Sequence, residues 1–244
     1  MLDLMTLFIE ITESDGASVE AHDAGNVVIA ALEEWGLLAT RVEDLQEESE
    51  PAMEAFVEQL ESADAGVQIA AGENIALLYE KSYTHVESDE EVSDAEDAED
   101  SDDPEADKEK SKFVKRYQVY RRQDQLLHTL ESLSDVSNRR ISKKDRKTLH
   151  SSFADIHRSV EKPTRGPGYS TAIDKETGKV YGGGRMKLRL NREFAIIIDK
   201  WWKLHTYNAL KRTLRGGVLQ HCMENEAVEA LLPVSAVSMR DRRG

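Results

Sequence analysis

The chain has 244 residues, of which 39% are apolar, and a formal net charge of −15. This composition allows one or two domains with modest cores, and it excludes a membrane-spanning chain because no apolar run approaches the ~20 residues that a bilayer requires. The single cysteine, Cys222, excludes an internal disulfide and a cysteine-rich zinc cluster, and it suits a reducing compartment.

The charge is divided between two halves of the chain. Residues 1–107 hold 32 acidic and 2 basic side chains, a net charge of −30, whereas residues 108–244 hold 15 acidic and 30 basic ones, a net charge of +15. A basic surface binds polyanions because each phosphate that Lys or Arg neutralises releases condensed counterions. The charge distribution therefore predicts an acidic scaffold followed by a separate basic docking module.

Two segments of the acidic half are similar at an offset of 40 residues. Residues 27–38 (VVIAALEEWGLL) align without a gap with residues 67–78 (VQIAAGENIALL), and a period near 40 is typical of HEAT and armadillo helical repeats. Amphipathic segments at residues 2–11 and 53–60 complete two helix pairs, with Pro51 expected in the first turn of the later segment.

Two repeats are fewer than a helical solenoid normally needs, because each repeat buries its apolar face against a neighbour. Either further repeats precede this segment, or the exposed end of the stack binds another molecule. We favour the first alternative as an expectation.

A strongly acidic segment follows the repeats. Residues 87–107 hold 13 acidic side chains in 21 positions and no basic ones, so the segment cannot bury enough apolar surface to offset its chain entropy. We predict a disordered linker. A second hypothesis is an intramolecular decoy that occupies the basic half when nucleic acid is absent.

The basic half begins with amphipathic patterns. Residues 113–133 form an amphipathic segment of mixed charge, and Ser142 opens a helix that should end before Pro163. Apolar residues recur on one face of this helix, so its basic residues largely point elsewhere. That face consists of Leu149, Phe153, Ile156 and Val160.

The residues after Pro163 predict both strands and helices. The glycine-rich residues 164–185 predict a hairpin, and strands follow at 186–190 and 194–198. Asp199 is expected to cap a helix over 200–214 that stops at Gly216–Gly217. A last short helix is expected over 226–232.

Several basic residues of this half are candidates for neutralising RNA phosphates. They are Lys143, Lys144, Arg146, Lys147, Arg158, Arg185, Lys187, Arg189, Lys203, Lys211 and Arg212. Two adjacent tryptophans, Trp201 and Trp202, are candidates for stacking on a base. Trp201 lies on the apolar stripe of its helix and is expected in the core, whereas Trp202 would point about 100° away from it.

Catalytic and metal-binding patterns are absent from the sequence. Gly182–Gly184 lacks the Gly-Lys-Ser/Thr ending of a phosphate-binding loop, and the seven histidines show no paired ligand spacing. Adjacency alone does not make His221 and Cys222 a base and a nucleophile. We predict no enzymatic activity, no metal, no cofactor and no small-molecule substrate.

Four segments of the chain together resemble a known family. They are AALEEWGLLAT and VQIAAGENIALLYE in the first half, and KKDRKTLHSSFADIHRSVE and IIIDKWWKLHTYNALKRTLRGGVLQHCMENEAVEALL in the second. The first two resemble the last repeats of the armadillo-like region, and the other two the carboxy-terminal domain, of the interferon-related developmental regulator family. The resemblance covers most of residues 20–83 and 112–233, and it implies a non-enzymatic regulator. Members of the family are described as transcriptional co-regulators, and some as factors that occupy idle ribosomes.

The predicted fold is mainly α, with a short armadillo/HEAT-like repeat segment followed by a small α+β carboxy-terminal domain. The predicted divisions are repeats at 1–85, an acidic linker at 86–111, a basic domain at 112–233 and a flexible basic tail at 234–244.

The predicted function is binding to ribosomes and structured RNA through the basic domain, which represses or stores inactive ribosomes. The alternative is a nuclear adaptor that binds protein partners through the acidic groove of the repeats in transcriptional co-regulation. The first residues resemble no secretory signal, so we expect a soluble cytoplasmic protein, with the nucleus as a second compartment and no membrane contact.

Overall fold

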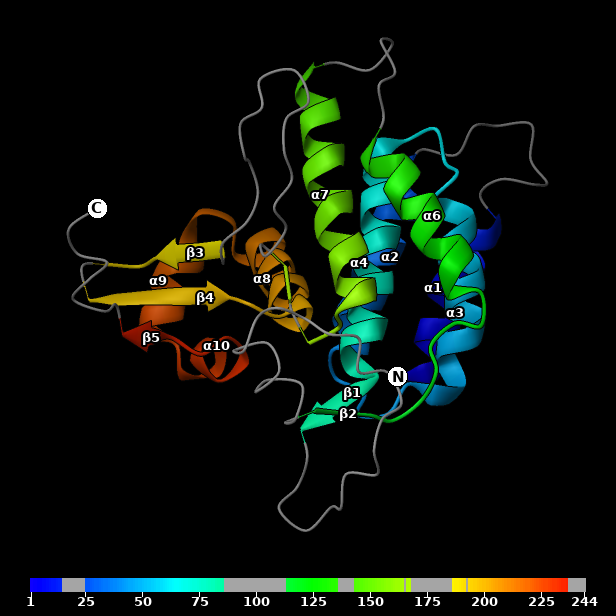
Figure 1. Ribbon diagram of the computed structural model, residues 1–244. Helices are drawn as coiled ribbons and strands as arrows, with labels where there is room; N and C mark the ends of the chain where they lie inside the picture. The colour runs from blue at the N-terminus through cyan, green and yellow to red at the C-terminus, as the bar shows by residue number, and fades with distance from the viewer. Residues whose placement is uncertain are drawn as a thin grey trace, which may run out of the picture.

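The structure is a computed structural model (Figure 1). It describes residues 1–14, 25–85, 113–135, 143–164, 166–167, 186–191 and 193–236. The predicted acidic linker, most of the predicted hairpin and most of the basic tail lie outside these ranges.

The two predicted helix pairs are confirmed. Helix α1 (Leu2–Ser14) packs against α2 (Gly25–Ala39), and α3 (Gln46–Gln59) packs against α4 (Ala65–Lys81). The pairs stack through α2 and α4, where the Asn74 side-chain amide donates to the Leu32 carbonyl oxygen at 2.8 Å. Trp35 and Phe56 meet edge to face between the pairs, with ring centroids 4.8 Å apart. The 40-residue similarity therefore corresponds to two stacked repeats.

Helix α3 begins five residues before the position that the proline predicted. Its first residue is Gln46, and Pro51 lies inside the helix. The additional turn is favourable because it buries Leu45 and Ser49, which are 0% and 2% exposed. The proline removes one helical hydrogen bond close to the start of the helix, where the cost is smaller than in its middle.

A third helix pair continues the stack. Helix α6 (Gln123–Ser134) packs against α7 (Lys143–Glu161), and α7 packs against α4. The predicted apolar face of α7 is confirmed, since its four residues are at most 2% exposed. Gly72 permits the close approach of α4 and α7, because a Cβ there would lie 2.6 Å from the Ile156 Cδ1 atom. Helix α4 therefore lies between α2 and α7, and we call α2, α4 and α7 the inner layer.

The segment 113–133 is not one continuous amphipathic element. Its first residues form β2 (Phe113–Lys115), which pairs antiparallel with β1 (Tyr83–His85). The pairing of β1 and β2 provides hydrogen-bond partners for the backbone N–H and C=O groups of these residues, as a helix would do elsewhere. Only the residues from Gln123 onward are helical, and Leu126 and Leu130 form the buried face of α6.

The carboxy-terminal residues form a small sheet with helices beside it (Figure 1). Strands β3 (Met186–Arg189), β4 (Phe194–Ile198) and β5 (Ser235–Ala236) are antiparallel in the order β3-β4-β5. The helices are α8 (Trp201–Leu214), a 3-10 turn (Arg215–Gly217), α9 (Val218–Glu224) and α10 (Glu226–Leu231). The two strands, α8 and α10 confirm predictions, whereas α9 and β5 had not been predicted.

The described residues share one hydrophobic core, which extends from Met5 in α1 to Leu232 after α10. The predicted fold class, mainly helical repeats with a small α+β region, is confirmed. The predicted domain boundaries at 85 and 112 stay predictions, but the elements on either side of them pack together. None of the helices in the described ranges is long and apolar enough to cross a membrane.

Candidate functional site

Helix α8 crosses the inner layer and contacts its three helices in succession. In Figure 1 it lies between the β3-β4-β5 sheet and the repeat helices. At its start, the Trp201 indole N–H donates to the Ser159 hydroxyl on α7 at 2.8 Å, and that hydroxyl donates to the Asp155 carbonyl oxygen. The first turn of α8 is thus attached to the third repeat.

The next contact is made by Glu80, at the end of α4. Its carboxylate accepts hydrogen bonds from the backbone N–H groups of Trp201 and Trp202 at 2.8 and 3.1 Å. These donors have no partner within the helix, and the positive end of the helix dipole favours an anion there. The prediction that Asp199 caps α8 is wrong. Asp199 instead accepts from the Lys203 ammonium at 2.6 Å, and the carboxylate cap comes from a residue 121 positions away in the sequence.

Glu80 is only 8% exposed, and this burial raises the pKa of its carboxyl group to about 7. The two N–H groups of α8 and the Lys200 ammonium act in the opposite direction, whereas Asp199 raises the pKa further. Burial is the largest contribution because a charged carboxylate loses its hydration in the core. Both protonation states of Glu80 are therefore populated near neutral pH.

The middle of α8 faces α4 and α2 through His205, which is 5% exposed. Its Nε2 atom lies 3.4 Å from the Glu73 carbonyl oxygen. Burial is the main cause that lowers the pKa of His205 to about 4; the contact with the Glu73 carbonyl oxygen opposes it and the nearby Arg212 adds to it, so the imidazole is neutral at physiological pH. Gly36 of α2 makes this approach possible, because a Cβ there would lie 2.4 Å from both His205 Nδ1 and Asn74 Oδ1.

The last turns of α8 contact the acidic face of α2. The Arg212 guanidinium forms ion pairs with Glu33 at 2.9 Å and Glu34 at 2.6 Å. The carboxylate of Glu33 also adds to the effect of burial on Glu73, whose pKa is raised to about 7. Arg212 was predicted to bind RNA phosphate, and the structure places its charge against the carboxylates of the repeats.

The predicted RNA-binding residues are distributed over three elements. Arg146 and Arg158 are half-buried on α7, and Lys203 is paired with Asp199. Lys147 on α7, Arg189 on β3 and Lys211 on α8 are exposed. The start of α7 and the sheet lie in different parts of the molecule (Figure 1). Arg185 and the side chains of Lys143, Lys144 and Lys187 are outside the described set.

The two tryptophans differ in exposure. Trp201 is 2% exposed, so it is not available to stack on a base. It lies in the core, as the apolar stripe of its helix had predicted. Trp202 is half-buried, and the Lys203 ammonium lies 5.6 Å from its ring centroid. Base stacking stays a prediction for Trp202 alone.

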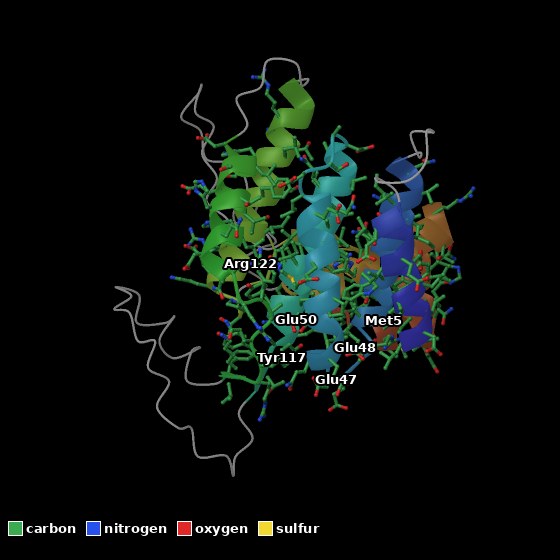
Figure 2. The ribbon with its side chains drawn as sticks, turned by 90° about the vertical axis from the view of Figure 1, so that its right-hand side faces the viewer. Met5, Glu47, Glu48, Glu50, Tyr117 and Arg122 are labelled. Carbon is green, nitrogen blue, oxygen red and sulfur yellow. The ribbon has the colours of Figure 1, made fainter. Side chains whose placement is uncertain are left out.

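A second contact between the acidic and basic halves lies beside α3. Figure 2 shows Glu47, Glu48 and Glu50 near the segment that carries Tyr117 and Arg122. Arg121 and Glu50 form an exposed ion pair at 3.6 Å, which contributes little to stability because solvent screens it. Burial raises the pKa of the Tyr117 hydroxyl to about 12.

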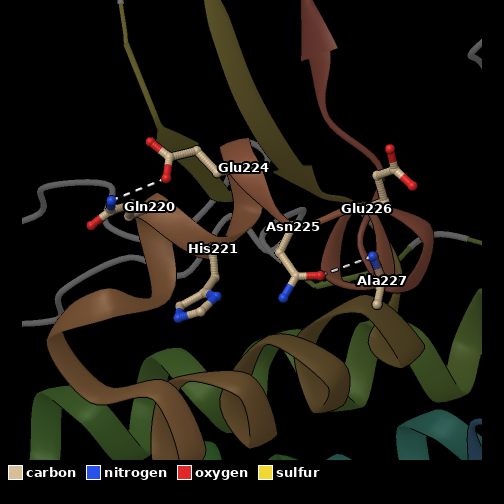
Figure 3. A pocket seen from close by; sticks show the side chains of 6 residues that line it. All are labelled: Gln220, His221, Glu224, Asn225, Glu226 and Ala227. Carbon is tan, nitrogen blue, oxygen red and sulfur yellow. Dashed lines mark hydrogen bonds between the residues drawn. The ribbon is translucent and has the colours of Figure 1, made fainter.

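An open pocket lies between α9 and α10 (Figure 3). It is lined by Gln220, His221, Glu224, Asn225, Glu226 and Ala227. The Asn225 side chain accepts from the Ala227 N–H at 3.0 Å and caps α10, and Gln220 donates to Glu224 at 3.0 Å. Asn225, Gln220 and Glu224 therefore already have hydrogen-bond partners in the wall of the pocket. Among the described residues, no group of three His, Cys, Asp or Glu side chains could hold a metal ion.

Sequence reasoning missed the residues of the inner layer that position α8. Gly36 offered a signal, because a glycine inside a helical pattern costs about 1 kcal/mol and often marks a close packing contact. Glu80 offered a weaker signal as a carboxylate directly after the apolar run 75–79. No feature of the neighbouring sequence indicated that Glu33 and Glu34 would pair with Arg212.

The chain is similar to known proteins over both halves. A family model described as interferon-related developmental regulator matches residues 1–161, and Glu161 is the last residue of α7. An uncharacterized protein of Schizosaccharomyces pombe is 35% identical over 164 residues, which are 67% of this chain and 34% of that protein. Interferon-related developmental regulator 1 of mouse and that of human are each 27% identical over 215 residues, 87% of this chain and 37% of theirs. The chain spans about a third of the length of these relatives.

Replacing Glu80 with Ala removes the cap of α8 and leaves two buried N–H groups without an acceptor. We expect the free energy of unfolding to fall by about 2–4 kcal/mol. Urea unfolding followed by tryptophan fluorescence measures this loss, and Glu54→Ala on the exposed face of α3 is the matched control that should change little.

The pH dependence of the free energy of unfolding reports on the charge of the Glu80 carboxyl group separately from its hydrogen bonds. Its pKa is raised from 4.5 to about 7 in the folded state, so the folded chain binds this proton more tightly than the unfolded chain. The stability of the wild type relative to Glu80→Gln should therefore fall as pH rises from about 4.5 to about 7, by up to about 3 kcal/mol. A stability difference that does not change with pH would contradict the buried position of this carboxylate.

Replacing Gly36 with Ala tests the approach of α8 to α2. The new Cβ would collide with buried atoms of His205 and Asn74, and overpacking of this kind costs about 1–3 kcal/mol beyond the helix propensity of alanine. We expect a net decrease in the urea midpoint. Gly216→Ala is the control, because nothing lies within 4 Å of its Cβ position. An unchanged or higher midpoint for Gly36→Ala would show that α8 does not pack here.

Proposed function

The chain belongs to the interferon-related developmental regulator family, and from that premise we propose that it is a non-enzymatic regulator that binds structured RNA. Ribosomal RNA is the proposed partner, and exposed basic residues of α7, α8 and the small sheet are the proposed contacts. The bound chain would keep ribosomes inactive, either as repression or as storage. The proposed compartment is the cytoplasm. Because the chain spans about a third of its relatives, these statements concern the described elements and their basic surface.

The observation that supports this proposal most is the position of the basic charge. Residues 108–244 carry a net charge of +15, and several of their basic side chains are exposed. Four of the exposed basic residues lie on separate elements, so a small anion could not reach them together. They are Lys147 on α7, Arg189 on β3, Lys211 on α8 and Arg215 in the 3-10 turn that follows α8.

A large folded polyanion suits such a surface better than a small ligand does. Phosphate contacts from several elements position a protein on nucleic acid without reading its sequence. Their contribution is electrostatic and falls as salt concentration rises. Structured RNA presents phosphates over the whole distance between α7, α8 and the small sheet, so it can contact them at the same time.

A nuclear protein-interaction adaptor is the second candidate. As predicted, it would bind partners through the groove of the repeats, but α8 covers α2 and α4 on that face. Such binding would require α8 to leave.

Reversing three exposed charges tests the RNA proposal. The variant Lys147→Glu, Arg189→Glu, Lys211→Glu should bind purified ribosomes at least tenfold more weakly in cosedimentation. If each residue contacts one phosphate, the slope of log affinity against log salt should decrease by about 2–3.

The matched control reverses three exposed basic residues of the segment between β1 and α6, Lys115→Glu, Arg121→Glu and Arg122→Glu. It has the same change in net charge and should bind as the wild type does. Equal weakening in both variants would indicate a response to net charge alone. Unchanged affinity and salt slope in the first variant would contradict the proposed contacts.

A further inference from the structure

The turn between α8 and α9 contains a residue in a strained backbone conformation. Arg215 has φ 47° and ψ −121°, and it is the one non-glycine residue with a positive φ in the described part of the chain. These angles are close to those of the first central residue of a type II′ turn. Glycine dominates that position, because a Cβ atom collides with the backbone there. The fold therefore holds an arginine where a glycine would be unstrained.

Two glycines follow Arg215, and neither of them needs the conformational freedom of glycine. Gly217 has φ −86° and ψ −5°, and the φ of Gly216 is not positive either. Among the described residues, no atom lies within 4 Å of a Cβ built on Gly216. An arginine at position 216 and a glycine at position 215 would thus fit this turn without strain. The chain instead has the arginine at the one position of the turn that favours glycine.

The backbone of this turn is held from both ends. Leu214, the last residue of α8, packs against the core, and Val218, the first residue of α9, is 7% exposed. The Arg215 N–H donates to the Lys211 carbonyl oxygen, and the Arg215 carbonyl oxygen accepts from the Val218 N–H. Three residues connect the two anchored helices. The point at which the Arg215 side chain leaves the backbone is therefore set by the fold.

The guanidinium of Arg215 has no polar contact within the described part of the fold. Its residue is exposed, and no carboxylate of the described residues pairs with it. Arg212, on the last turn of α8, pairs with Glu33 and Glu34 instead. The two arginines therefore differ: Arg212 attaches α8 to the repeats, whereas Arg215 is presented to solvent. Strain at a residue whose side chain does not pair within the fold is typical of a binding position.

The surroundings of Arg215 suit a phosphate group. Lys211, four residues earlier, is also exposed, so two cations lie at this end of α8. An arginine binds a phosphate through two parallel N–H···O hydrogen bonds, which fixes the orientation of the ligand. Gly216 is exposed and has no side chain, so a phosphate that reaches Arg215 can also approach the backbone closely.

We propose that the turn Arg215–Gly217 is a phosphate-binding turn, in which Arg215 binds one phosphate of the RNA backbone through both arms of its guanidinium. The inference rests on the RNA-binding function proposed above. It adds that this contact depends on the position of the arginine and not only on its charge. Because the turn is anchored on both sides, the guanidinium is presented in one place before RNA binds, which lowers the entropic cost of the contact.

Exchanging the two residues tests the inference at constant composition and net charge. The variant Arg215→Gly together with Gly216→Arg moves the arginine by one position and relieves the positive φ. We expect a higher urea midpoint than that of the wild type. In cosedimentation with purified ribosomes we expect at least fivefold weaker binding, and the slope of log affinity against log salt should decrease by about 1.

Two single variants separate position from charge. Arg215→Gly removes the arginine and should bind ribosomes as weakly as the exchange variant does. Arg122→Gly removes one charge from another exposed arginine and is the matched control. It should bind within about twofold of the wild type, because one charge far from the contact changes the affinity little.

Two results would overturn the inference. Binding of the exchange variant equal to that of the wild type would show that an arginine at either position suffices. A lower urea midpoint of the exchange variant would show that the positive φ of Arg215 is not a source of strain.

The charge-reversal variant Lys147→Glu, Arg189→Glu, Lys211→Glu distinguishes the two proposals in the same assay. Weak binding of that variant beside wild-type binding of the exchange variant would refute the role of Arg215 and leave the RNA-binding function standing. A wild-type chain that does not sediment with ribosomes would refute both.

Discussion

The buried carboxylate of Glu80 accepts hydrogen bonds from the first two N–H groups of α8, and the position of that helix depends on this contact. Once the start of α8 is held at the end of α4, its course brings Trp201 to Ser159 on α7, His205 to Gly36 on α2, and Arg212 to Glu33 and Glu34. A carboxylate with a pKa near 7 is an unusual cap, because burial opposes its charge while the helix dipole and two donors favour it. The contact therefore joins the acidic repeats to the basic half in the core.

The sequence patterns predicted the elements better than their partners. The apolar face of α7 was predicted residue by residue, because helical periodicity reports which side of a helix is buried. Periodicity does not report what covers that side, so α7 was assigned to the basic domain although it packs on α4 as a third inner helix. Asp199 was predicted to cap α8 from local spacing alone, and the true acceptor comes from the first half of the chain. Arg212 was predicted to contact RNA from charge counts, which do not show its pairing with Glu33 and Glu34 inside the fold, and its contact with RNA stays a prediction.

This arrangement changes how the charge division is understood. The acidic repeats do not only repel a polyanion; they also bind part of the basic half through α2, and the exposed ion pair of Arg121 and Glu50 adds a weaker contact beside α3. The proposed RNA contacts Lys147, Arg189 and Lys211 are exposed and lie on α7, β3 and α8. These elements can contact RNA while Arg212 keeps α8 paired with the repeats.

The most direct test of the account is native-state hydrogen exchange of the backbone amides of Trp201 and Trp202 over a range of denaturant concentrations. If Glu80 joins α8 to the repeats as one cooperative unit, these two amides should exchange through the same global opening as the buried amides of α4. Their opening free energy should then equal the free energy of unfolding. Exchange of the two amides through a separate opening of lower free energy, while α4 stays protected, would contradict the account.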